Sequence, residues 1–392
     1  MQYSERMSWL GTEGAFEVLA RCRQLEAQGK EIIHLEIGEP DFMTPKNICD
    51  AAIKAIRDGH THYCPSGGVP QVREIVAEHV SSTRGVNVSP ENVVIMPGVK
   101  PLVFNSILAL INPGDEVIVP DPGYPAYESV VSFVGAKPVS LRLREENQFR
   151  FFADELKELI SPKTKMVVVN SPQNPTGGVL TKKDLEAIVE LAQKHDLWIM
   201  ADEIYSRIIY DVEFQSIGSI PGALERTILL DGMSKTYAMT GWRLGYAVVP
   251  RKLAESLAKL AINNFSCTST FSQYAMIEAL TGLQDEVDKM VVEFKRRRDV
   301  IVDGLNKIEG LRCLKPLGTF YVFPNITGTG LKSAELAKLL LDEFGVACLS
   351  GTAFGQYGEG YVRFSYANSV ENIKEALNRI EKALAGVRQM AK

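Results

Sequence analysis

The sequence predicts an α/β protein, with a large, mainly parallel sheet between helices and a smaller α+β unit. Through the middle of the chain, short runs rich in valine and isoleucine alternate with amphipathic helical stretches, which is typical of buried parallel strands. After about residue 290 the pattern changes to a long charged helix, short strands and further helices. With 392 residues, 45% of them hydrophobic, the chain is long enough for two domains.

Each strand of the large sheet is predicted by a short apolar run that is followed, in most cases, by a Gly/Pro loop and a helical pattern. These runs are residues 92–96, 116–120, 166–170, 197–202, 227–231 and 246–250. In such sheets ligands bind beyond the carboxyl ends of the strands. Polar residues at these ends are therefore the candidate site.

Composition and charge exclude several classes of function. The net charge of -5 and the lack of a dense basic stripe argue against nucleic acid as a partner, and the cationic cluster at 295–298 is interpreted as a solvated helix face. Charges at the N-terminus, and runs far shorter than ~18 apolar residues, argue against a signal peptide and a membrane span. Six cysteines without metal-binding spacing indicate reduced thiols, a cytoplasmic protein and no metal site.

The most informative segment is residues 231–246, DGMSKTYAMTGWRLGY. Lys235 lies between two apolar runs, where an ammonium group needs a reason to be close to a core. Schiff-base chemistry supplies one, because a lysine amine can be joined to a carbonyl cofactor while an arginine, here Arg243, holds the cofactor's phosphate.

Two further strand ends fit the same cofactor. Asp202 ends the run 197–202, where a carboxylate is costly unless paired; a pyridinium N–H would pair with it, and a helix N-cap is the alternative. Gly98 lies between a strand and a helical pattern. The backbone N–H groups of Gly98, Val99 and Lys100 would there suit a phosphate dianion.

These segments resemble the lysine region, strand ends and loops of class I pyridoxal-phosphate (PLP) aminotransferases of fold type I, which are aspartate aminotransferase-like. The resemblance runs along nearly the whole chain and implies PLP as cofactor. The implied cofactor-binding residues are Tyr63, Gly98, Val99, Lys100, Tyr124, Asn174, Asp202, Tyr205, Ser234, Lys235 and Arg243. It also implies an N-terminal arm (1–14), a small domain (15–45 plus 290–392) and a large PLP-binding domain (46–289).

The resemblance implies a role for each residue. Lys235, Asp202 and Tyr205 are the expected catalytic residues, and Tyr205 lies about one helical turn after Asp202. Its phenol and Asn174 would contact the 3′-oxygen of the cofactor, while Tyr124 stacks on the ring. Tyr63 would reach the phosphate in a neighbouring subunit, which implies a homodimer with shared active sites; loop packing is the alternative.

Substrate binding centres on Arg363 in the segment GYVRFSYA. An arginine on an alternating strand can point inward, and it matches the family's ligand for the substrate α-carboxylate; a surface position on an edge strand is the alternative. Gly38 and Asn174 would complete this end. The implied reaction is ping-pong transfer of an amino group from an L-amino acid to a 2-oxo acid, with Lys235 as anchor and general base.

The side-chain preference stays open. Lys100 matches a lysine that binds distal carboxylates in some relatives, which favours 2-oxoglutarate as one partner, but a glutamate near Glu13–Ala15 would repel an acidic side chain. Alanine or aromatic amino acids are alternative substrates, and a β-lyase or γ-elimination reaction on the same fold is an alternative activity. A PLP-binding transcription regulator lacks a spare basic segment here, and a Rossmann dehydrogenase lacks its GxGxxG.

Overall fold

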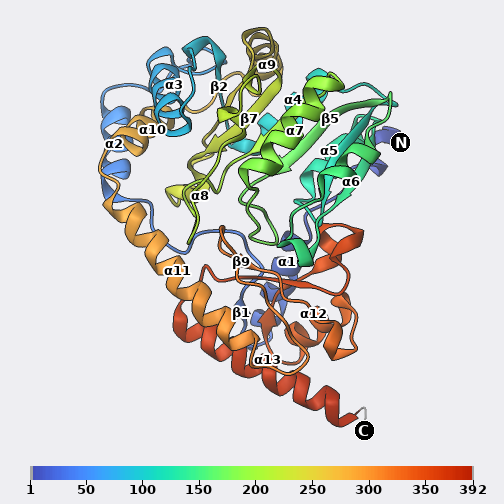
Figure 1. The fold of residues 1–392 in the computed structure, drawn as a ribbon. Coiled ribbons are helices and arrows are strands. Elements are labelled where there is room, and N and C mark those ends of the chain that lie inside the picture. Colours follow the sequence, from blue (N-terminus) through green and yellow to red (C-terminus); the bar gives the residue numbers. More distant parts are fainter. Residues whose placement is uncertain (1–2, 391–392) are drawn as a thin grey trace.

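The computed structural model describes residues 3–390 (Figure 1). Residues 1–2 of the predicted arm and 391–392 of the predicted small domain lie outside the described residues. The larger half of the molecule contains a seven-stranded sheet in the order β2-β8-β7-β6-β5-β3-β4. Its strands are β2 (Val93–Met96), β3 (Glu116–Asp121), β4 (Lys137–Arg142), β5 (Thr164–Asn170), β6 (Trp198–Asp202), β7 (Thr227–Gly232) and β8 (Gly245–Val248).

Neighbouring strands are parallel except at β8, which is antiparallel to both β2 and β7. The prediction of a mainly parallel sheet is confirmed, and each of the six apolar runs forms a strand. Strand β4 was not predicted from the sequence. It lies at an edge of the sheet and is only partly buried, so its sequence KPVSLR lacks a continuous apolar run.

Helices cover both faces because successive strand residues point in opposite directions. On β5, Met166 and Val168 pack into a core with α4, α5 and α9, whereas Val167 and Val169 pack into a core with α6 and α7. A third core joins the β2–β8 edge to α2, α3 and α10. These helices, with the short α8, are α2 (Lys46–Arg57), α3 (Pro70–Arg84), α4 (Val99–Leu110), α5 (Ala126–Phe133), α6 (Ala153–Leu159), α7 (Lys182–Lys194), α8 (Met233–Thr236), α9 (Arg251–Asn264) and α10 (Thr270–Thr281).

The smaller half combines the segment that contains α1 and β1 with the C-terminal part of the chain, whereas the N-terminus itself lies beside the larger half (Figure 1). Strand β1 (Ile33–His34) pairs in parallel with β10 (Val346–Ala347), and β9 (Tyr321–Val322), β11 (Leu349–Ser350) and β12 (Val362–Ser365) form an antiparallel sheet. Its helices are α1 (Gly14–Ala27), α11 (Asp285–Leu305), α12 (Ser333–Asp342) and α13 (Val370–Met390). The pairing of β1 with β10 joins two segments that are far apart in the sequence, as expected for a small domain made from both 15–45 and 290–392. Its boundaries stay a prediction, and the one at 289/290 falls inside α11.

Short 3-10 helices complete the described elements. They are η1 (Glu5–Ser8), η2 (Pro90–Asn92), η3 (Glu145–Asn147), η4 (Ile217–Ser219), η5 (Leu224–Arg226), η6 (Thr327–Thr329), η7 (Gly351–Phe354) and η8 (Gln356–Gly358). None of the helices within residues 3–390 combines the length and the hydropathy needed to span a bilayer.

The interpretation of residues 295–298 as a solvated helix face is wrong for half of the cluster. Arg297 and Arg298 are buried, with side chains 9% and 0% exposed. Arg297 pairs with Asp41, and Arg298 pairs with Asp211. These acidic partners are distant in sequence, so the run of four cations gave no sign that half of them face the protein interior.

A buried ion network lies at the carboxyl ends of β6 and β7. The guanidinium of Arg84 donates to Glu203 Oε2 at 3.1 Å and to Asp231 Oδ2 at 2.7 Å, and all three side chains are almost fully buried. Burial raises the pKa of both carboxyls, which the charge of Arg84 opposes. The network therefore allows two acidic groups to be buried close to the junction between β7 and α8, the helix that contains Lys235.

We expect Arg84→Met to destabilise the protein by about 3–5 kcal/mol, because two carboxylates then stay buried without a cation. Urea-induced unfolding of the wild type and the variant measures the difference. Lys54→Met is the control, since the Lys54–Asp58 pair is mostly exposed and contributes less than about 1 kcal/mol. Equal effects of the two substitutions would show that the buried network has no special weight.

Candidate active site

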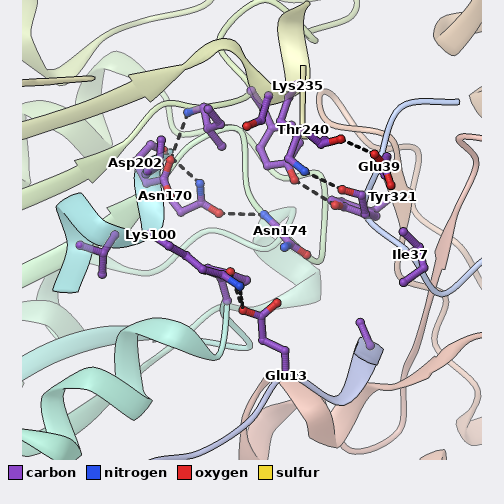
Figure 2. Close-up of a pocket in the computed structure, with 18 of the residues that line it drawn as sticks. Glu13, Ile37, Glu39, Lys100, Asn170, Asn174, Asp202, Lys235, Thr240 and Tyr321 are labelled. Atoms are coloured by element: carbon purple, nitrogen blue, oxygen red, sulfur yellow. Dashed lines mark hydrogen bonds and ion pairs between the residues drawn. The ribbon is translucent and has the colours of Figure 1, made fainter. Parts of the chain in front are cut away.

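A cavity of about 570 Å³ lies where the carboxyl ends of the central strands face the smaller half. The sheet side supplies Asn170, Asp202 and Lys235, and the smaller half supplies Tyr321 (Figure 2). The smaller half also supplies Arg363. The lining residues are Glu13, Ala15, Phe16, Ile37, Gly38, Glu39, Val99, Lys100, Val103, Tyr124, Tyr127, Asn170, Asn174, Asp202, Ile204, Tyr205, Ser234, Lys235, Thr240, Gly241, Arg243, Tyr321 and Arg363.

Lys235 reaches the cavity from α8, the single helical turn that follows β7. Its Nζ donates a hydrogen bond to the backbone oxygen of Gly38 at 2.5 Å. Burial lowers the pKa of Lys235 to about 8, because the charged form loses its hydration, and the nearby charge of Arg363 acts in the same direction. About a tenth of this amine is therefore uncharged, and nucleophilic, at pH 7, which is far more than for a lysine with the ordinary pKa.

Asp202 ends β6 with its carboxylate buried beside the cavity. Tyr127 donates its O–H to Oδ2 at 2.7 Å, and the N–H of Ile204 donates to Oδ1 at 3.1 Å. Burial raises the pKa of Asp202 to about 6 despite these two donors. No arginine or lysine of residues 3–390 forms an ion pair with it, so this carboxylate can still accept a cationic N–H.

The segment after Asp202 differs from its sequence interpretation. Residues 204–207 form turns rather than an α-helix, so Tyr205 is not placed by a helical repeat. The Tyr205 hydroxyl nevertheless lines the cavity, and it lies 2.9 Å from the Tyr321 hydroxyl in the smaller half. The short strand end and its turns therefore join the two sides of the cavity.

Arg363 is a buried cation at the opposite wall. Nη1 donates to Asn174 Oδ1 at 3.1 Å, Nη2 donates to the backbone oxygen of Glu36, and Nε is buried without a partner. Its guanidinium also lies 4.3 Å from the centre of the Tyr321 ring. Burial lowers the pKa of Arg363, and within the described chain it pairs with no carboxylate. A buried guanidinium with spare donors is suited to an anionic ligand.

A second arginine lies at the start of α4. Arg243 donates to the backbone oxygens of Thr240 at 2.7 Å and Pro97 at 3.2 Å. Gly98 precedes α4 with φ 91°, and a Cβ there would lie 2.4 Å from Nη2 of Arg243. Glycine is therefore required for this arginine to approach the N-terminus of α4, whose first N–H groups have no partner within the helix.

The N-terminal segment contributes an acidic group to the same cavity. Tyr124 donates its O–H to Glu13 Oε1 at 2.8 Å, and Lys100 forms an ion pair with the same oxygen (Figure 2). Glu13 directly precedes α1, and its neighbour Gly11 is held by Ser129 through a 2.9 Å hydrogen bond. The acidic residue suspected from the sequence thus lies against the lysine that was expected to attract acidic substrates.

The structure brings most of the sequence-predicted residues to the cavity. Those that line it are Gly38, Val99, Lys100, Tyr124, Asn174, Asp202, Tyr205, Ser234, Lys235, Arg243 and Arg363. Gly98 adjoins it through Arg243. Tyr63 does not line it and is 88% exposed, so its expected role needs a second subunit. The individual roles of these residues stay predictions.

Sequence reasoning missed several polar residues of the cavity. Asn170 follows the buried run of β5, so the strand-end argument that identified Asp202 could have identified it too. Tyr127, Thr240 and Tyr321 gave no such signal, because their segments read as an ordinary helix, loop and strand. Asn170 Oδ1 accepts from the backbone N–H of Asn174 at 2.9 Å, which positions that side of the cavity.

We expect Lys235→Met to stabilise the cofactor-free protein at pH 7 by up to roughly 3 kcal/mol, because it removes a buried charge. The folded pKa of about 8 lies below the ordinary value of 10.5. The gain is therefore complete below about pH 8 and disappears as the pH rises to about 10.5. Urea unfolding across this range measures it, with the exposed Lys252→Met as control. A gain that is independent of pH would contradict this explanation.

Comparisons with known proteins identify the family of this chain. The family description "Aminotransferase class I and II" matches residues 30–380. An aspartate aminotransferase of Pyrococcus abyssi is 44% identical over 91% of this chain and 92% of its own length, and an aromatic-amino-acid aminotransferase of Thermococcus litoralis is 44% identical over 91% and 93%. The structure of Thermus thermophilus aspartate aminotransferase with maleate superposes with a TM-score of 0.94, at 36% identity, over 98% of this chain and 100% of that one. The chain belongs to the class I and II aminotransferases, which use PLP, and it is an aminotransferase of the aspartate/aromatic group.

Proposed function

We propose that this enzyme holds PLP on Lys235 and transfers the amino group of an L-amino acid to a 2-oxo acid by a ping-pong mechanism. The observation that carries the proposal is one cavity with a partly buried amine and two arginines that pair with no described carboxylate. Arg243 lies at the N-terminus of α4, and Arg363 lies on the opposite wall. Such a cavity is suited to a cofactor and a substrate that together place one anionic group at each arginine and a carbonyl group at Lys235.

The residues present fit the cofactor. The phosphate would lie between Arg243, the hydroxyl of Ser234 and the N-terminus of α4, where a Cβ at Gly98 would leave no room. Asp202, buried and without a cationic partner, would accept the ring N–H, and ionisation of Asp202 is then favoured. The Tyr205 hydroxyl and Asn174 would contact the ring oxygen. Bound in this way, PLP supplies an electron sink for charge developing at the substrate Cα.

The chain's own groups then perform binding and proton transfer. Arg363 would clamp the α-carboxylate through two donors, with Nε as the spare donor, and this fixes the direction of the Cα–H bond. The Nζ of Lys235 would take up the Cα proton, since its lowered pKa leaves an uncharged fraction near neutral pH. Tyr321 packs against Arg363 and keeps water from one side of it.

The enzyme would act as a homodimer. Tyr63 is 88% exposed in the single chain, and a tyrosine ring left in water is typical of a surface that contacts a partner. We place it at the phosphate site of the neighbouring subunit, as the family resemblance implies.

The substrate test follows from Lys235. Lys235→Ala should abolish transamination of every amino acid in a donor panel with 2-oxoglutarate, while non-covalent cofactor binding persists. Oxo-acid formation and the cofactor's absorbance follow the two halves of the reaction. Release of pyruvate and ammonia without an oxo-acid acceptor would instead identify a lyase. Normal transamination by the variant would remove Lys235 from its role.

Glutamate and 2-oxoglutarate are the proposed pair for one half-reaction, and a neutral or aromatic amino acid for the other. Glu13 Oε1 contacts both Lys100 and Tyr124, so a distal carboxylate has to compete with Glu13 for the lysine. A substrate without a side-chain charge leaves this pair in place. The Glu13–Lys100 pair would thus allow one cavity to accept both classes.

Glu13→Gln should raise kcat/KM for glutamate about tenfold, because Lys100 loses its competing anion and a factor of ten corresponds to about 1.4 kcal/mol. Alanine and phenylalanine should change less than about twofold, since the amide oxygen of the new side chain still accepts a hydrogen bond from Tyr124. Steady-state kinetics with each donor measures the effect. Glu17→Gln is the control, as Glu17 contacts Thr12 and does not line the cavity. Equal changes for all donors would show that Glu13 does not select side chains.

A further inference from the structure

A second cluster of reactive side chains lies outside the cavity, where α1 packs near β1. Cys22 and Glu26 are one turn apart on α1. His34 ends β1 and Glu36 follows it two residues later, with its carboxylate 2.8 Å from the His34 ring. The sulfur of Cys22, a ring nitrogen of His34 and a carboxylate oxygen of Glu36 all lie within 4.8 Å of one another. The fold therefore brings a thiol, an imidazole and a carboxylate together.

The Glu36 side chain is unsatisfied in this arrangement. Glu36 is 0% exposed, its Oε1 lies 2.8 Å from His34 Nδ1, and its Oε2 is buried without a partner. Within the described residues, the His34 imidazole is the sole partner of the Glu36 side chain. Cys22 is also 0% exposed. A buried carboxylate oxygen without a hydrogen bond costs free energy, and a cation would remove that cost.

The other ring nitrogen of His34 is already oriented. Nε2 lies 3.0 Å from Glu26 Oε1, so this carboxylate can hold the proton on Nε2. Nδ1, which lies 2.8 Å from Glu36 Oε1, can then present its lone pair to a cation that replaces this contact. A carboxylate behind the second nitrogen is the usual outer partner of a metal-binding histidine. This contact is independent of the unpartnered oxygen of Glu36.

We propose that Cys22, His34 and Glu36 bind a divalent cation of the zinc type, with Glu26 orienting the histidine ring. Thiolate, imidazole and carboxylate are together the donors that zinc accepts, and hard cations such as Mg²⁺ do not favour sulfur. Three protein ligands and one water complete a tetrahedron. Binding releases to solvent both the thiol proton of Cys22 and the proton shared between His34 Nδ1 and Glu36 Oε1. The donors then close in by small rotations to about 2.0–2.3 Å from the ion.

The site would connect α1 to the strand that leads to the active site. The backbone oxygen of Glu36 accepts from Arg363, and that of Gly38 accepts from Lys235. A metal held by Glu36 and Cys22 would fix this segment against α1 and stabilise the folded chain, without contacting the substrate. The proposal does not rest on the identity of the substrates.

The test uses the full-length holoenzyme, stripped by a chelator and dialysed against zinc or cobalt. Metal analysis should find one zinc per chain, and cobalt should give the visible d–d bands of a tetrahedral thiolate site, beyond the cofactor's own absorption. Zinc should also raise the Tm of the protein. Lys235→Ala should bind the same amount, which separates this result from any failure of the proposed catalysis.

Cys22→Ser and Glu36→Gln should each weaken zinc binding at least tenfold, because each nearly isosteric change removes one ligand charge. Cys313→Ser is the matched control, since Cys313 is also buried but lies outside the cluster. A wild type that retains no zinc and gives no cobalt bands overturns the proposal, whether or not the variants fold. Binding by Cys22→Ser and Glu36→Gln as tight as that of the wild type overturns it as well.

Discussion

The active site depends on charged groups that the protein buries and leaves without counter-ions. Asp202, Glu203 and Asp231 are three carboxylates at the ends of two neighbouring strands, and all are buried. Arg84 pairs with both Glu203 and Asp231. Asp202 receives only a phenol and a backbone N–H. The fold therefore places one cation between two of these carboxylates, and it leaves the third, which faces the cavity, without a cation.

The same contrast applies to the cations. Arg297 and Arg298 are buried against acidic partners, and they hold α11 in place. Arg363 is equally buried, but its hydrogen bonds go only to an amide and a backbone oxygen, and one of its nitrogens has no partner. Desolvation of unpaired charge costs free energy, so such groups persist where a ligand completes them. This difference in pairing, rather than burial alone, separates the groups that bind ligands from those that stabilise the fold.

The N-terminal segment reaches the cavity at two places. Glu13, Ala15 and Phe16 line the cavity, as do residues 37–39, and most of α1 and all of β1 lie between these two stretches. The acidic Glu13, the oxygen that accepts from Lys235 and the thiol–imidazole–carboxylate cluster thus belong to one stretch of about 25 residues. Substrate selection and the proposed metal site would both act through the placement of this segment. Its contacts with β10 and Arg363 are what tie it to the rest of the smaller half.

The sequence by itself determined every strand of the large sheet except β4, because burial on both faces produces apolar runs that stop abruptly. Asp202, Gly98 and Lys235 were identified at or shortly after the ends of such runs, and the roles expected of them come from a resemblance to a family. The contact of Tyr321 with Arg363, the pairing of Glu13 with Lys100, and the burial of Arg297 and Arg298 came only from the tertiary structure. So did the grouping of Cys22 with His34 and Glu36, which spacing rules based on paired cysteines do not detect. Charge compensation and metal coordination depend on distances through space, and these are set by packing between segments that are far apart along the chain.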